Sequence, residues 1–255
     1  MKILNKSTQA GEFFPYGLLK LEYQSSYDNF KDWAFILPGK NPEFWIIVLH
    51  GHGSHGDQLY TRKDVRETWL EPLSATGAGI ITPNLRDNAW MNPAAAFDMH
   101  ELIDYLRNEY GLKKTLFYSG SMGGTGNLIY SVLYPEDVDA VVTLGGATDL
   151  KSYRQWCLKQ ERPIAHEIAE AISTAYKEDD LEKHSTLLNA DKLNMPIYFS
   201  HGGADEIIPV EQARMLAEKL KDKPDFFYKE IPGGNHDSPL YEIEGLNKIM
   251  ERIGK

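Results

Sequence analysis

Several features that define other protein classes are missing from this sequence. Cys157 is the only cysteine among 255 residues, so the chain cannot close an internal disulfide, which is typical of a reducing compartment. No stretch approaches the roughly 18 apolar residues of a membrane span, and the first residues lack the apolar run of a secretory signal. We therefore expect a cytoplasmic protein without a membrane partner; secretion would require a signal peptide already removed from a precursor.

Positive charge is also scarce, since 27 Lys and Arg face 37 Asp and Glu and leave a formal net charge of −10. A protein that coats phosphate backbones needs a basic face, so we expect no nucleic-acid partner. Apolar residues make up 42% and charged residues 25%, as in ordinary globular proteins. No repeat, low-complexity tract or linker divides the chain, and nothing in it indicates an oligomeric state. We expect one domain over residues 1–255.

Strand-like and helix-like segments alternate along the chain. A helix is predicted over residues 93–110, because Asn92 and Pro93 form a typical helix start and Gly111 a typical helix end. Residues 210–220 repeat this scheme. Such alternation predicts a mainly parallel sheet, with ligands bound beyond the carboxyl ends of its strands. Eight strands are predicted, at residues 18–24, 32–38, 43–50, 78–84, 115–120, 139–146, 196–202 and 225–231.

A candidate nucleophile lies at the end of the fifth predicted strand. Residues 119–124 read SGSMGG and are followed by a helical run, so Ser121 sits at a sharp turn between strand and helix. Small neighbours permit so tight a turn, and the Met122 N–H would face the atom that the serine attacks. Two alternatives are an unreactive Gly/Ser turn and a phosphate loop; the segment lacks the lysine that a phosphate loop carries.

A base and an acid follow at later strand ends. Asp205 comes just after the seventh predicted strand, and His236 lies in the Gly-rich loop after the eighth. Asp205 would orient the imidazole of His236, which would take the proton from Ser121. The neighbouring carboxylates Glu206 and Asp237 are alternatives for the acid. Asp205 could also be a simple turn residue, and His236 a surface histidine.

The loop after the third predicted strand reads HGHGSHGD over residues 50–57. Its glycines allow close backbone approach to a ligand, so the His52 N–H is a candidate second donor to an oxyanion, with Gly53 as the alternative. We expect no metal and no cofactor, although a zinc site is the competing interpretation of four side chains in this loop, His50, His52, His55 and Asp57.

Four motifs together resemble the α/β-hydrolase superfamily: VLHGHG (48–53), SGSMGG (119–124), HGGADEIIP (201–209) and GGNH (233–236). The chain looks most similar to compact esterases and to the catalytic domains of prolyl-oligopeptidase-type and dienelactone-hydrolase-type enzymes. This resemblance implies an eight-stranded sheet in the order 1-2-4-3-5-6-7-8, flanked by helices, with only strand 2 antiparallel. Ser119 stands where glycine is commoner, and Ser121 stands where dienelactone hydrolases carry cysteine. A serine nucleophile implies acyl transfer to water.

Residues 149–191 exceed an ordinary connection between strand and strand and suggest a lid of one or two amphipathic helices. Tyr153 and Trp156 in this lid, with Asn88 and Trp90 after the fourth predicted strand, are candidate substrate contacts. We expect a serine esterase acting on a small-molecule ester, with aryl or plant-polymer esters (feruloyl or acetyl type) as one possibility. A small aminopeptidase or amidase on the same residues and a non-catalytic binding protein are the alternatives.

Overall fold

One sheet of nine strands organises the chain, described here over residues 1–254 from a computed structural model. Its strand order is β1-β2-β3-β5-β4-β6-β7-β8-β9. Only β1 and β3 run against the other strands. The strands are β1 (Lys2–Thr8), β2 (Leu19–Gln24), β3 (Lys31–Leu37), β4 (Asn41–Ile47), β5 (Ala78–Pro83), β6 (Lys114–Gly120), β7 (Ala140–Leu144), β8 (Ile197–Gly202) and β9 (Phe226–Ile231).

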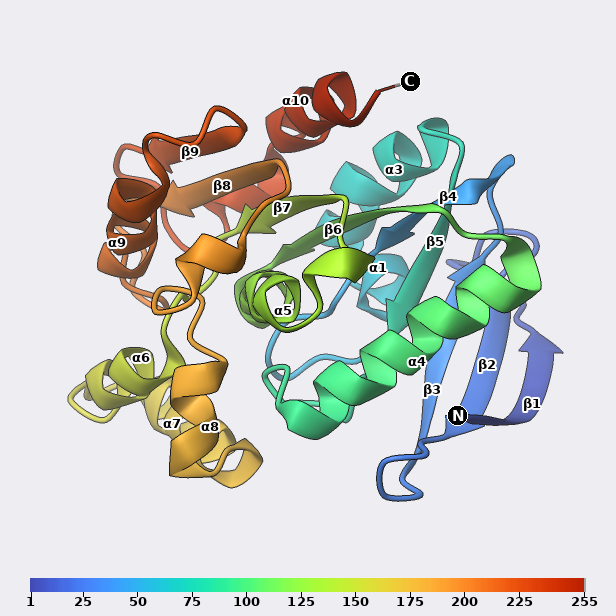
Figure 1. Cartoon of the computed structure of the whole chain (residues 1–255), viewed down its shortest axis with the longest axis horizontal. Helices are drawn as coiled ribbons and strands as arrows, with labels where there is room; N and C mark the ends of the chain where they lie inside the picture. Colours follow the sequence, from blue (N-terminus) through green and yellow to red (C-terminus); the bar gives the residue numbers. More distant parts are fainter. Residues whose placement is uncertain (255) are drawn as a thin grey trace.

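The eight predicted strands are confirmed as β2 to β9, in the predicted order. The predicted total was wrong by one, because β1 adds a ninth strand at the sheet edge next to β2 (Figure 1). This strand is exposed along almost its whole length, so it carries no apolar face from which the sequence could have shown it. The strand predicted over 43–50 ends earlier, at Ile47, and the chain then enters the loop that borders the candidate site.

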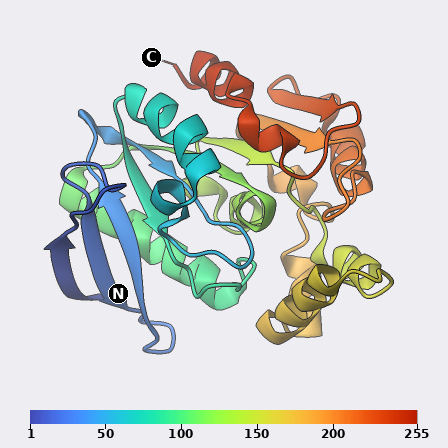
Figure 2. The same ribbon diagram turned by 180° about the vertical axis from the view of Figure 1, so that it is seen from behind.

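Helices cover both faces of the sheet, as the two opposite views show (Figures 1 and 2). One face is covered by α4 (Pro93–Tyr110), α5 (Ser121–Leu133) and α9 (Glu211–Leu220), whose apolar residues belong to one buried cluster. The other face is covered by α1 (Gln58–Thr61), α2 (Lys63–Val65), the π-helical turn Arg66–Leu70, α3 (Glu71–Ala75) and α10 (Glu244–Ile253). Short 3₁₀ helices occupy Pro135–Asp137, Ala190–Lys192 and Ser238–Tyr241.

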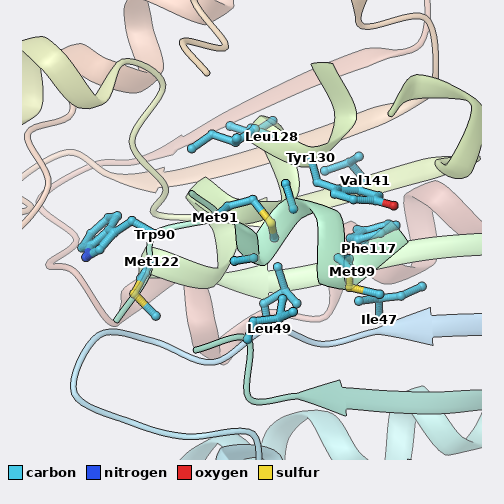
Figure 3. Close-up of a cluster of buried hydrophobic side chains, with 14 of the residues drawn as sticks. Ile47, Leu49, Trp90, Met91, Met99, Phe117, Met122, Leu128, Tyr130 and Val141 are labelled. Carbon is cyan, nitrogen blue, oxygen red and sulfur yellow. The ribbon is translucent and has the colours of Figure 1, made fainter. Parts of the chain in front are cut away.

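Both signals predicted for the ends of α4 are confirmed. The Asn92 side chain accepts a hydrogen bond from the Ala95 N–H at its start, and Gly111 ends it with φ +75°, a left-handed conformation that favours glycine. The buried face of α4 includes Met99 and Leu102. Figure 3 shows Met99 in the same apolar cluster as Phe117 from β6 and Leu128 from α5. This packing fixes the strand that leads to the candidate nucleophile.

The long connection between β7 and β8 forms three helices rather than the one or two predicted. They are α6 (Leu150–Cys157), α7 (Pro163–Ala175) and α8 (Glu178–Lys183), and they lie together to one side of the sheet (Figure 1). Ala165, Ile168 and Ile172 line the buried face of α7, whereas Glu167 and Glu170 are exposed. No helix within residues 1–254 is long and apolar enough to cross a membrane.

Candidate active site

Ser121 lies at the tip of a strained turn between β6 and α5. Its φ is +56°, the left-handed region that non-glycine residues rarely adopt. Small neighbours are required sterically: a Cβ on Gly123 would lie 2.3 Å from the Leu49 carbonyl oxygen, and one on Gly120 would lie 2.3 Å from Leu240 Cδ2. The predicted turn is therefore present, and its strained conformation is held by the close packing of β6, α5 and the loop after β4.

The three residues predicted as nucleophile, base and acid come together in space. His236 Nε2 lies 2.8 Å from Ser121 Oγ, and His236 Nδ1 lies 2.7 Å from Asp205 Oδ2. The two competing carboxylates are engaged elsewhere, since Glu206 pairs with an arginine, Arg162, and Asp237 lies 3.3 Å from Arg62. The geometry thus singles out Asp205 as the carboxylate that holds His236.

Asp205 is surrounded by hydrogen-bond donors and is only 8% exposed. The backbone N–H groups of Ile207 and Ile208 donate to its Oδ1, at 2.8 and 2.9 Å. Burial alone would raise the pKa of Asp205, but hydrogen bonds from His201 and His236 and the charge of His236 hold that pKa below its usual value. Asp205 therefore stays ionised opposite the imidazole.

His201 is a contact of this group that the sequence reasoning missed. Its side chain is fully buried, and its Nε2 lies 2.9 Å from the Ile208 carbonyl and 3.3 Å from Asp205 Oδ2. It opens the motif HGGADEIIP, four residues before Asp205. That spacing was its only signal, and it does not distinguish a contact of the carboxylate from an ordinary strand residue.

The loop after β4 borders the nucleophile. A Cβ built on Gly51 would lie 4.0 Å from Ser121 Cβ. The Gly53 N–H donates to Asn88 Oδ1 at 2.7 Å, whereas the His52 N–H has no acceptor among residues 1–254. Met122 occupies the first turn of α5, where backbone N–H groups lack partners within the helix. His52 thus fits the donor predicted in this loop better than Gly53 does. The Met122 N–H fits the other predicted donor.

The side chains that suggested a zinc site point to separate partners. The two ring nitrogens of His50 lie 2.9 Å from the Gly51 carbonyl and 2.8 Å from the Asn84 carbonyl. His55 Nδ1 lies 3.0 Å from Asp87 Oδ1. In the part of the chain that the structure describes, no three His, Cys, Asp or Glu side chains gather in a way that could hold a metal ion.

The loop of residues 84–92 next to the site contains a left-handed turn without glycine. Arg86 holds it in place: its guanidinium contacts Asp28 through two nitrogens, at 2.7 and 2.8 Å, and Asp98 at 2.7 Å. The Arg86 N–H also donates to Asp32 Oδ2 at 2.7 Å. These contacts offset the strain of five non-glycine residues with positive φ, Leu85, Arg86, Asp87, Trp90 and Met91.

Two of the four predicted substrate contacts are buried. Trp90 is 1% exposed and Tyr153 is fully buried; their rings lie 5.8 Å apart, and the Tyr153 hydroxyl donates to the Ile207 carbonyl at 3.0 Å. Trp156 is partly buried and stacks on Tyr153. Trp90 and Tyr153 therefore pack beneath the loops instead of presenting a surface to a ligand, while Asn88 uses its oxygen on Gly53.

An open cavity of about 680 Å³ lies beside His52, between the 84–92 loop and α7. Asn88 lines it from the loop, and Glu167, Glu170 and Thr174 line it from one face of α7. Burial lowers the pKa of His52, partly against the charge of Glu167, so the imidazole is neutral at neutral pH. Charged and polar side chains line this cavity together with Phe30 and three alanines, so its wall is mixed, and neither Trp90 nor Tyr153 contributes to it.

Cys157 has no access to this chemistry. Its side chain is fully buried, and burial raises the pKa of its thiol to about 11. A thiol that stays protonated is a poor nucleophile. Cys157 ends α6 and does not lie in a turn between a strand and a helix.

Comparison with known proteins agrees with this architecture. Residues 45–162 match the family described as alpha/beta hydrolase fold, and none of the curated proteins matches the chain. An esterase of Pyrococcus furiosus, Pf2001, superposes with a TM-score of 0.72 at 15% identity, covering 98% of this chain and 100% of that one. The chain is therefore a protein of the α/β-hydrolase fold class.

Two further solved structures have the same fold. An S-formylglutathione hydrolase from Agrobacterium tumefaciens has a TM-score of 0.70 at 14% identity, with all of both chains covered (100% and 100%). A fluorophosphonate-binding serine hydrolase of Staphylococcus aureus, FphF, has a TM-score of 0.71 at 15% identity, covering 94% of this chain and 99% of that one. The fold is thus shared along nearly the full length of each of these proteins.

Proposed function

We propose that this protein is a serine hydrolase that cleaves carboxylic esters through an acyl-enzyme intermediate. The observation that carries the proposal is the continuous chain of contacts from Ser121 through His236 to Asp205, at 2.8 and 2.7 Å. A serine needs such a base, held by a third group, to act as a nucleophile. The names of the structural neighbours, esterases and serine hydrolases among them, support the same class.

Each group has a defined task in this reaction. Ser121 Oγ attacks the ester carbonyl while His236 Nε2 takes its proton, and the N–H groups of Met122 and His52 stabilise the negative oxygen that develops. His236 then gives the proton to the departing alcohol, which leaves the acyl group on Ser121. Water attacks this acyl-enzyme with His236 again as base, and the carboxylic acid leaves. Asp205 stays ionised and stabilises the charged imidazole.

We propose that the substrates are small esters and that helices α6 to α8, which lie within residues 149–191, act as a cap. The cavity beside His52 is open, and its wall combines charged and polar side chains with Phe30 and three alanines, which suits a small ester that carries both a polar and an apolar group. Rates on ester and amide analogues of one acyl group would test the alternative of an aminopeptidase or amidase. A clear preference for the amide would overturn the assignment of esters.

The proposal is tested with p-nitrophenyl esters of increasing acyl length and a hydroxycinnamate ester. We expect turnover of short esters, and a fall of at least about a thousandfold in kcat for Ser121→Ala, as for other serine triads. A fluorophosphonate should label the parent but not Ser121→Ala, and Cys157→Ser should behave as the parent. Turnover by Ser121→Ala within tenfold of the parent would show that another nucleophile acts.

A further inference from the structure

We propose that Ser119, Gln58 and Asn88 are positioning residues that hold residues 49–53 so that the His52 N–H faces the oxyanion. This inference rests on the proposed function. Every second backbone N–H from Leu49 to Gly53 donates to a side-chain oxygen of one of these residues, at 2.7 to 2.8 Å. The His52 N–H, between the last two, is left without an acceptor among residues 1–254.

The Ser119 side chain accepts a backbone hydrogen bond just beyond the end of the pairing between β4 and β6. β4 and β6 pair in parallel from Phe44 with Lys114 to Ile47 with Phe117, so the same register brings Leu49 opposite Ser119. There the Leu49 N–H donates to Ser119 Oγ at 2.8 Å. The hydroxyl in turn lies 3.1 Å from Asn127 Oδ1 in α5. A glycine at position 119 would leave the Leu49 N–H without this acceptor.

Gln58 and Asn88 bind the next two positions from other directions. The Gly51 N–H donates to Gln58 Oε1 at 2.8 Å, and Gln58 belongs to α1. The Gly53 N–H donates to Asn88 Oδ1 at 2.7 Å from the loop after β5. The three anchors thus come from three separate parts of the fold. A glycine-containing loop is otherwise free to rotate its N–H groups, and these contacts remove that freedom.

The anchors act on the transition state because the oxyanion forms only there. Losing one oxyanion donor completely typically lowers kcat by roughly 10²–10³. A donor that is present but less well oriented should lose part of this effect, and we expect a fall of about 5–50-fold for one missing anchor. KM should change little, since the ground-state carbonyl depends less on the donor.

Matched pairs of variants separate the acceptor from the bulk of each side chain. Asn88→Asp and Gln58→Glu keep an oxygen that can accept the N–H, whereas Asn88→Leu and Gln58→Met keep a similar volume without it. Ser119→Ala removes the buried hydroxyl and provides a third, independent test. Gln58 does not line the cavity beside His52, so its variants are free of substrate contacts there.

The readouts are kcat and KM on p-nitrophenyl acetate and the inhibition constant of a trifluoromethyl ketone, whose adduct with serine carries an oxyanion. We expect Asn88→Leu and Gln58→Met to lower kcat and to weaken the ketone by about the same 5–50-fold, with KM within about threefold. Asn88→Asp and Gln58→Glu should each lose less kcat than the matched Leu or Met variant, because they keep an oxygen that accepts the N–H. Thermal unfolding identifies any variant that has simply failed to fold, and the other anchors then carry the test.

The outcomes distinguish this inference from the proposed function. If turnover depends on Ser121 but folded variants lacking the acceptor keep the parent kcat, the anchors have no such role. The same conclusion follows if the Asp and Glu variants lose as much activity as the Leu and Met variants. If Ser121→Ala turns over esters as fast as the parent, the proposed function itself fails, and the inference about the anchors fails with it.

Discussion

The left-handed conformation of Ser121 makes a prediction about stability that is separate from activity. Ser121 has φ +56°, and glycine adopts this region without the steric cost that a Cβ imposes. Ser121→Ala and Ser121→Gly both remove the hydroxyl and its contact with His236, so both should be inactive. They differ only in the Cβ, and we expect the glycine variant to be the more stable of the two.

The size of this difference follows from two opposing effects. A left-handed conformation costs an L-residue about 1–2 kcal/mol, which Ser121→Gly relieves. Glycine also gains freedom in the unfolded chain, which costs about 0.5–1 kcal/mol on folding. The net advantage over alanine is about 0.5–1 kcal/mol, or a rise in Tm of about 1–4 °C for a chain of this size.

Differential scanning calorimetry of the two variants under identical conditions measures this difference. Gly111 supplies the matched control because its φ is +75° and a Cβ there would meet nothing within 4 Å. Gly111→Ala therefore imposes strain without a collision, and its Tm should fall by a similar amount. If Gly111→Ala is destabilised but Ser121→Gly is no more stable than Ser121→Ala, the idea of strain stored at the nucleophile is refuted.

Three further predictions concern the site. Gly123→Ala should lower kcat by about 10²-fold or more by displacing the loop of the oxyanion donors, since its Cβ would lie 2.3 Å from the Leu49 carbonyl oxygen; parent-like kinetics would contradict the packing. The kcat/KM profile should show one acid limb below about pH 6–7, where histidine ordinarily titrates, because the lowered pKa of Asp205 keeps that carboxylate ionised; a flat profile down to pH 4 would exclude a histidine base. A carboxylate whose pKa is depressed in the folded state stabilises the fold above its unfolded pKa of about 3.9, and this stabilisation is lost as the pH falls toward the folded pKa. Asp205→Asn should therefore have a lower Tm than the parent at pH 7. The difference in Tm between the two proteins should shrink below about pH 4. A deficit that stays constant with pH would show that Asp205 acts through packing alone.

The sequence predicted the strands and the three residues that meet around His236 because both depend on local patterns. Buried strands such as Phe44–Ile47 have continuous apolar runs, and the sharp turn at Ser121 demands small neighbours at fixed spacing. Asp205 and His236 follow strand ends, and parallel strands bring such ends to one edge of the sheet. These features can be predicted from the sequence without knowing which side chains are in contact.

Other features depend on contacts between distant segments and could not be predicted from the sequence. Strand β1 has no apolar face, so only its pairing with β2 reveals it. Trp90 was placed at a substrate surface, but an aromatic residue after a strand has the same sequence signal whether it packs inward or faces a ligand. Gln58 and Asn88 use side-chain oxygens on backbone N–H groups 7 and 35 residues away, a kind of contact that leaves no periodic trace.

The left-handed turn around Arg86 has a consequence for the order of folding. Its restraints come from Asp28 and Asp32, 58 and 54 residues earlier in the chain, and from Asp98 in α4. The turn lacks these restraints until Asp28, Asp32 and Asp98 are in place, and contacts that close long loops form slowly. We therefore expect the sheet and α4 to assemble first, so that the surroundings of Ser121 become ordered in the last stage of folding.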